Sequence, residues 1–143
     1  MKNFSVKILA VLILLLLGLS VKSQTNELEG IWALSDIELY KHTGNDSIQI
    51  NSSQILPHNM RVVIDTLSFF DDKCKAKINN DPMESLYAKK NNTLELYFFP
   101  TPFVYEIIHI DDKYMELYYK YPDVSLDNIN NTIFYKIRLK YSK

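Results

Sequence analysis

The residues of this chain that could do chemistry are few and far apart. Thiol or metal chemistry would depend on three histidines and one cysteine, which are His42, His58, His109 and Cys74. Their positions do not show the spacing that metal ligands need, and the sequence holds no nucleophile-elbow, phosphate-loop or zinc-protease motif. We therefore predict a protein that is not an enzyme and that uses no cofactor and no metal.

His109 and Cys74 have structural interpretations instead. His109 alternates with apolar residues, which predicts a hydrogen-bonded histidine in the core or at its rim. Cys74 falls on an expected inward face, where a thiol behaves as a small hydrophobic side chain, and the alternative is a reactive or intermolecular thiol. A lone cysteine cannot form an internal disulfide.

Two pairs of neighbouring aspartates, Asp71-Asp72 and Asp111-Asp112, resemble the paired carboxylates of acid–base catalysis. Each pair lies between two strand-like segments, however, where an aspartate side chain accepts hydrogen bonds from the backbone of its own turn. We therefore interpret both pairs as turn residues.

Tyrosine is the unusual feature of the composition: there are ten residues, and eight of them, from Tyr97 onward, crowd the C-terminal half. The rings could line a cavity and offer oriented hydroxyls to an amphipathic ligand. They could also simply suit half-buried strands. A third interpretation is an outer aromatic patch for a protein partner, because Tyr114 and Tyr118 fall on the face opposite Met115 and Leu117.

The first 23 residues have the pattern of a cleavable signal peptide, with Lys2 and Lys7 before an apolar run of ten residues from Ile8 to Leu17. A permanent N-terminal anchor is the alternative. No cysteine lies directly after the run to take a lipid, because the only cysteine is Cys74. We therefore expect a periplasmic or secreted protein that meets the membrane only through the transient signal peptide. Residues 24–143 then form one domain.

The charge of that domain excludes one class of partner. Three lysines leave with the signal peptide, so 13 basic residues remain against 17 acidic ones, and the net charge is about −4. Both signs are interspersed and no basic stripe occurs, which argues against nucleic acid as a partner.

The elements that must position any site are strands. Alternation of polar and apolar residues predicts strands over Gly30–Tyr40, Arg61–Phe70, Lys73–Ile78, Ser85–Lys89, Thr93–Phe99, Phe103–Ile110, Tyr114–Tyr121 and Ile133–Lys140. The first strand changes parity at Ser35-Asp36, which indicates a bulge. Lys41–Asn59 is predicted as a long loop, in which Ile48–Ile50 is either a short extra strand or part of a lid.

Eight antiparallel strands with short connections favour a closed up-and-down β-barrel, and a two-sheet β-sandwich is the alternative. In the C-terminal hairpin, Tyr105, Ile107 and His109 are expected to share one face.

Three stretches resemble the lipocalin-like domains of small secreted bacterial proteins. Leu28-Glu29-Gly30-Ile31-Trp32 is similar to the G-x-W opening of the first strand, Thr66–Asp72 to the second strand and its turn, and Tyr105–Ile108 with Met115–Leu117 to a late hairpin. The resemblance implies a barrel in which a basic residue of the last strand packs over Trp32. Arg138 is the candidate by position.

The leading hypothesis is an exported, non-catalytic protein that binds a small hydrophobic or amphipathic ligand inside the barrel. The candidate lining residues are the inward-facing ones, namely Trp32, Leu34, Leu94, Leu96, Phe98, Tyr105, Ile107, Met115, Leu117, Tyr119, Tyr135 and Ile137. The alternative is an envelope protein-interaction or inhibitor domain that acts through its loops and an outer aromatic face.

Overall fold

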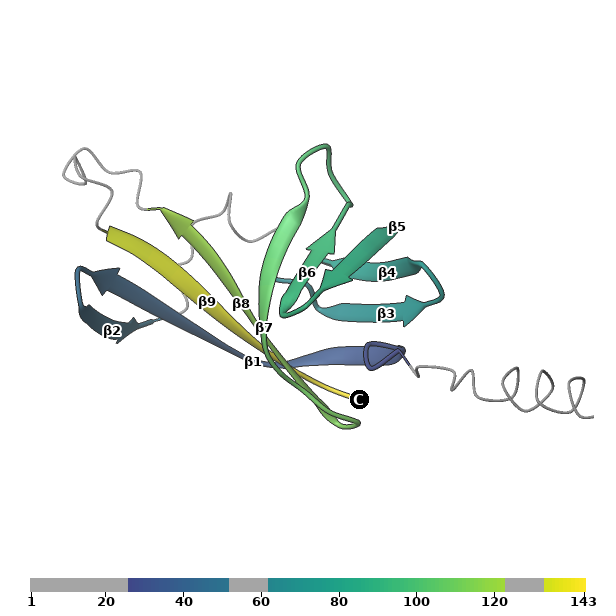
Figure 1. The fold of residues 1–143 in the computed structure, drawn as a ribbon, viewed down its shortest axis with the longest axis horizontal. Coiled ribbons are helices and arrows are strands. Elements are labelled where there is room, and N and C mark those ends of the chain that lie inside the picture. The colour runs from purple at the N-terminus through teal and green to yellow at the C-terminus, as the bar shows by residue number, and fades with distance from the viewer. Residues whose placement is uncertain (1–25, 52–61, 123–132) are drawn as a thin grey trace, which may run out of the picture.

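A computed structural model describes residues 26–51, 62–122 and 133–143. These residues form nine β-strands and no helix (Figure 1). The strands are β1 (Gly30–Thr43), β2 (Asp46–Ile50), β3 (Thr66–Phe70), β4 (Lys73–Ile78), β5 (Asp81–Lys90), β6 (Thr93–Leu96), β7 (Phe103–Ile110), β8 (Tyr114–Pro122) and β9 (Ile133–Ser142).

The nine strands make one antiparallel sheet that closes on itself. The order is β2-β1-β3-β4-β5-β6-β7-β8-β9, and β9 pairs with β1 to complete a barrel of eight strands, with β2 as an extra strand beside β1. Closure removes the sheet edges that a sandwich would leave. The predicted barrel is confirmed, and its strand order is compatible with the lipocalin-like resemblance.

The parity change in the first strand is a bulge, as predicted. The register between β1 and β9 shifts between Leu34 and Asp36, and the hydroxyl of Ser35 donates to the carbonyl of Lys140 at 2.9 Å. The extra residue lets one long strand pair with β3 near its start and with β2 near its end, while β9 follows most of its length.

The prediction of a loop over Lys41–Asn59 was wrong for Lys41–Thr43, and of the two alternatives for Ile48–Ile50 the short extra strand is confirmed. Lys41–Thr43 continue β1 because they remain paired with β9, and Ile48–Ile50 belong to β2. Gly44, at φ +59°, makes the tight turn between the two strands. Residues 52–59 of the predicted loop lie outside the described residues.

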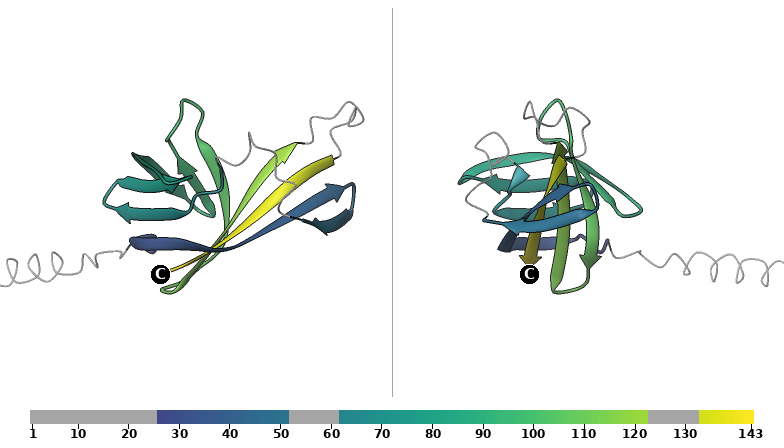
Figure 2. Two further views of the ribbon diagram at one scale, coloured as in Figure 1. Left: turned by 180° about the vertical axis from the view of Figure 1, so that it is seen from behind. Right: turned by 90° about the vertical axis from the view of Figure 1, so that its left-hand side faces the viewer.

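The second half of β1 leaves the barrel together with its neighbours. Figures 1 and 2 show that β8, β9 and β1 run out past β3 to β6, with β2 at the outer edge. We call this part of the sheet the extension and define it as Leu39–Thr43, β2, Tyr119–Pro122 and Ile133–Ile137.

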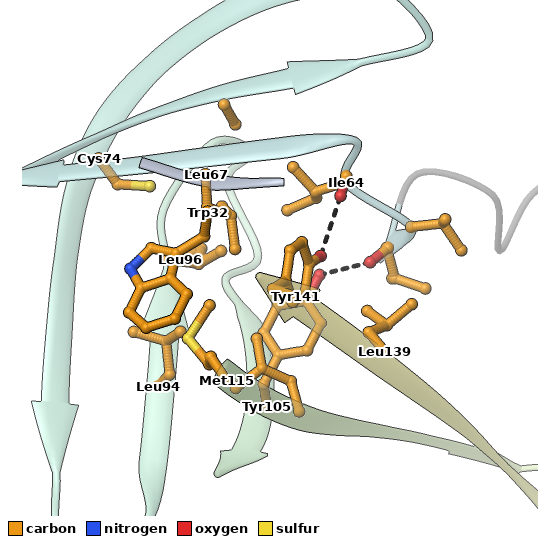
Figure 3. Close-up of a cluster of buried hydrophobic side chains, with 14 of the residues drawn as sticks. Trp32, Ile64, Leu67, Cys74, Leu94, Leu96, Tyr105, Met115, Leu139 and Tyr141 are labelled. Carbon is orange, nitrogen blue, oxygen red and sulfur yellow. Dashed lines mark hydrogen bonds between the residues drawn. The ribbon is translucent and has the colours of Figure 1, made fainter. Parts of the chain in front are cut away.

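The barrel interior is filled by side chains from all parts of the sheet. Trp32, Phe69, Tyr105 and Tyr141 are the largest of those that are fully buried. Figure 3 shows Trp32, Tyr105 and Tyr141 among them. β4 follows the predicted alternation: Cys74, Ala76 and Ile78 are buried, whereas the three lysines that alternate with them are exposed. This pattern is that of a strand with one face on the core and one in water.

The second predicted strand is shorter than expected. Strand β3 begins at Thr66, and Val62, Val63 and Ile64 are buried without being part of a strand. The backbone carbonyls of Val62 and Ile64 instead accept hydrogen bonds from the hydroxyls of Tyr105 and Tyr141 (Figure 3). Arg61 lies outside the described residues.

The remaining hairpins agree with the predictions except at their ends. The predicted loop Asn79–Pro82 is only a two-residue turn, because Asn79 and Asn80 both adopt positive φ (50° and 69°), which matches the twist of the flanking strands. β6 ends at Leu96, three residues before the predicted end.

Candidate functional site

The structure brings the predicted lining residues into one apolar cluster. Eight of the twelve are buried: Trp32, Leu94, Leu96, Tyr105, Ile107, Met115, Leu117 and Ile137. The other four are partly buried and pack against that cluster: Leu34, Phe98, Tyr119 and Tyr135. The fold therefore divides the candidate site into a sealed part and a half-open part.

The polar groups of the sealed part are used by the protein itself. Tyr105 donates its hydroxyl to the carbonyl of Val62 at 2.8 Å, and Tyr141 donates to the carbonyl of Ile64 at 2.9 Å. Burial raises the pKa of both phenols well above the usual value, so both remain neutral donors. These hydroxyls hold a backbone segment in place, as buried polar groups must find partners.

The half-open part is a series of aromatic rings that leads from β7 into the extension. Ring centroids lie 6.3 Å apart for Phe103 and Tyr119, 6.4 Å for Tyr119 and Tyr121, and 5.1 Å for Tyr121 and Tyr135, the last pair at an interplanar angle of 17°. All four side chains are half-buried. We call Phe103, Tyr119, Tyr121 and Tyr135 the aromatic row.

Strand register explains why these rings meet. Tyr121 is directly opposite Tyr135, and Tyr119 is directly opposite the buried Ile137. Paired residues share a face of the sheet, and so do residues two apart along a strand. The aromatic row is therefore a continuation of the core onto the extension.

One basic side chain shares the face of the aromatic row. Lys41 is directly opposite Tyr135, and its Nζ lies 5.9 Å from the centroid of that ring. The sequence analysis missed Lys41, Tyr121 and Phe103 as site residues. For Lys41 the signal was present, because the parity of Ile37 and Leu39 continues to residue 41.

The outer face of the same strands carries a network of ion pairs. Arg138 binds Glu116 through two parallel hydrogen bonds of 2.7 and 2.9 Å and contacts Glu38 at 3.0 Å. Lys140 bonds to Glu38 at 2.6 Å and to Asp36 at 3.0 Å. Arg138 therefore does not pack over Trp32, because its parity places it on the face away from the core.

The outer aromatic face is not a continuous patch. The ring of Tyr118 is covered by basic side chains, with Nζ of Lys136 at 5.0 Å and the guanidinium carbon of Arg138 at 6.0 Å from its centroid. Tyr114 is 59% exposed. A shallow hollow of about 290 Å³ lies beside Tyr118, between Val104 and Lys120.

His109 was predicted to lie in the core or at its rim, and this prediction was wrong because its side chain is exposed. The register between β7 and β8 shifts between Ile107 and His109, and this irregularity turns His109 out of the core face. It is exposed and lies 2.9 Å from a carboxylate oxygen of Asp111. The prediction for Asp111 as a turn residue is confirmed, since Oδ1 accepts hydrogen bonds from the backbone N–H groups of Lys113 and Tyr114, both at 2.8 Å.

His42 lies on the outer face of β1 and stacks on Phe134 at 4.6 Å with nearly parallel rings. Burial, followed by the positive charges of Lys136 and Lys120, lowers the pKa of its imidazole. His58 lies outside the described residues. Within the described ranges, no three residues among His, Cys, Asp and Glu gather closely enough to hold a metal ion.

Comparison with protein-family models, with curated proteins and with solved structures finds no match to this chain. The structure itself defines the class: an all-β protein with a closed antiparallel barrel of eight strands and one added strand. The described ranges contain no helix that is long and apolar enough to cross a membrane.

Proposed function

We propose that this protein is an exported, non-catalytic, lipocalin-like binding protein that holds one small hydrophobic or amphipathic molecule against the aromatic row. The carrying observation is that Tyr121 and Tyr135 stack 5.1 Å apart on the face that continues the core and stay half-buried there. Aromatic rings with one apolar face and a polar hydroxyl suit amphipathic ligands.

The close packing of the sealed part of the barrel favours the aromatic row as the location of a ligand. Trp32, Leu94 and Leu117 have no exposed surface, and the Tyr105 hydroxyl is already used by the backbone of Val62. A ligand at the aromatic row needs no displacement of these side chains, whereas a ligand deeper in the barrel would have to replace close-packed contacts.

Native mass spectrometry of the protein isolated gently from its own host tests the proposal. We expect a discrete added mass that is lost on denaturation and is strongly reduced in Tyr135→Leu. The matched control is Tyr114→Leu, which removes an exposed ring from the opposite face and should keep the adduct. A bare mass in the wild-type protein would overturn the proposal and favour an interaction domain that acts through loops and outer surface.

Export is a separate part of the proposal and is supported by the sequence pattern of residues 1–23. We expect the mature protein to begin at Gln24 and to be recovered from the periplasm or the medium. Determination of its N-terminal sequence checks this. A mature chain that keeps Met1 would contradict cleavage and favour the N-terminal anchor.

A further inference from the structure

Lys41 differs from the other half-buried basic side chains that the structure describes. Lys136, Arg138 and Lys140 each have a carboxylate partner, which is Glu106 at 4.0 Å, Glu116 at 2.7 Å and Glu38 at 2.6 Å. Within residues 26–51, 62–122 and 133–143, no carboxylate lies within ion-pair distance of Lys41.

Lys41 also lies on a different face of the sheet from the three paired side chains. The three paired side chains lie on the outer face, whereas Lys41 shares a face with Tyr135 and with the buried Leu39. Its flanking residues on that face are apolar or aromatic: Ile48 is opposite on β2 and Tyr135 is opposite on β9. Ile48 is 65% exposed, so this part of the face is open to solvent and an anionic group of a ligand can reach the unpaired charge of Lys41.

The contact with Tyr135 only partly compensates the charge of Lys41. A distance of 5.9 Å from Nζ to the ring centroid is near the outer limit of a cation–π interaction. The ammonium group can donate three hydrogen bonds, and an anionic oxygen accepts them more strongly than a neutral one.

We propose that the bound molecule is an amphipathic anion. Its carboxylate, sulfate or sulfonate group contacts Nζ of Lys41, and its apolar part lies along Tyr135, Tyr121 and Tyr119. The order of residues across the sheet, with the cation on β1 and the rings on β9 and β8, fits a molecule with a charge at one end. This inference rests on the proposed function, because it assigns a ligand class to the same site.

Two fluorescent dyes with the same ring skeleton distinguish the contribution of the ligand's charge from that of its apolar rings. The anionic dye is 8-anilino-1-naphthalenesulfonate, and the neutral one is N-phenyl-1-naphthylamine, which lacks the sulfonate. Titrations of both dyes into the exported protein give two dissociation constants. In wild type we expect the anionic dye to bind about 10-fold more tightly, as one charge-assisted contact allows.

Lys41→Met is the test variant, because it keeps an unbranched side chain only one atom shorter and removes the charge. We expect it to weaken binding of the anionic dye about 10-fold and to leave the neutral dye unchanged within about 2-fold. Lys41→Arg should retain the preference for the anion. A thermal melt of each variant establishes that it folds.

Lys120→Met is the matched control. Lys120 is also a lysine of the extension that lies over an aromatic ring, with Nζ 3.9 Å from the centroid of Phe134, but it is exposed on the outer face. Its loss should change neither dissociation constant if the ligand binds on the face of Lys41.

The outcomes distinguish the two proposals. If both dyes bind equally and Lys41→Met changes neither, the anion inference is wrong while ligand binding stands. If neither dye binds to wild type, or if Tyr135→Leu leaves both dissociation constants unchanged, binding at the aromatic row is itself wrong. If Lys120→Met weakens the anionic dye as much as Lys41→Met does, the charge effect is not local to Lys41 and the inference fails.

Discussion

Lys143 lies over Trp32, with its Nζ 4.3 Å from the centroid of the indole ring. The resemblance had implied that a basic residue of the last strand packs there, and Arg138 was the wrong candidate. Lys143 instead follows β9 directly, and its backbone N–H donates to the carbonyl of Lys113 at 3.0 Å. The indole N–H of Trp32 donates to the carbonyl of Leu28 at 2.7 Å. Both ends of the described domain are thereby tied to one ring.

Gly30 is required by its backbone conformation, and Gly30→Ala should destabilise the protein. Its φ of +126° is one that side-chain-bearing residues rarely adopt, and an added Cβ would lie 2.9 Å from Cε of Lys143. We expect a loss of about 1–3 kcal/mol in the free energy of unfolding, measured by urea titration. Gly44→Ala is the control, because a Cβ there meets nothing within 4 Å and only the strain of φ +59° remains. Equal losses in the two variants would show that φ +126° at residue 30 costs no more than the ordinary left-handed φ at residue 44.

The tyrosine hydroxyls that hold Val62 and Ile64 should contribute measurably to stability. Tyr105→Phe and Tyr141→Phe each remove one buried donor and leave a buried carbonyl without that partner. We expect each substitution to lower the free energy of unfolding by about 1–3 kcal/mol in a urea titration.

Tyr114→Phe provides the comparison, since Tyr114 is 59% exposed and its loss leaves no buried carbonyl without a donor. Its free energy of unfolding should stay within about 0.5 kcal/mol of wild type. If the two buried substitutions are equally harmless, the hydroxyls do not hold the segment of residues 62–64.

Acid should weaken the fold partly through Glu38. Hydrogen bonds from Lys140 and Tyr40, opposed by burial and aided by Arg138, lower the pKa of this carboxyl from 4.5 to about 2. A group whose pKa is lower in the folded state stabilises the fold fully above its unfolded pKa. That stabilisation is lost as pH falls from about 4.5 towards 2.

Urea titrations between pH 6 and pH 2 check this for wild type and Glu38→Gln. We expect the variant to be less stable than wild type at pH 6 and the difference to shrink as pH falls to 2. Glu84→Gln removes a partner of Lys73 on the exposed surface, where ion pairs contribute little, and should follow the wild-type curve. A difference between wild type and Glu38→Gln that is constant with pH would contradict the assignment.

The alternation of polar and apolar residues along the sequence was sufficient to predict most strands of the barrel. In Lys73–Ile78, polar and apolar residues alternate strictly, and burial follows that pattern residue by residue. The bulge at Ser35 was visible too, because it interrupts the same alternation. Both features are local, so a single sequence contains them.

The features that sequence reasoning missed depend on distant or irregular contacts. Val62–Ile64 is as apolar as a strand, and only hydroxyls far along the chain, on Tyr105 and Tyr141, determine that its carbonyls bond elsewhere. His109 has the parity of the core face, but the register shift after Ile107 reverses it. Lys41 has the parity of Ile37 and Leu39, but it precedes a polar run, and only its pairing with Tyr135 of β9 shows that the strand continues through it.

Cys74 should be inert in the folded protein. Its side chain has no exposed surface, and burial raises the pKa of the thiol to about 12, so almost none of it is thiolate at pH 8. We expect iodoacetamide to alkylate the native protein far more slowly than the urea-unfolded protein, with a rate that follows the unfolded fraction as urea rises. Ser47→Cys in a Cys74→Ala background is the control, because residue 47 is exposed on β2 and should react without urea. Fast alkylation of the native wild-type protein would mean that the barrel opens at β4 without unfolding, and the alternative of a reactive thiol would then be correct.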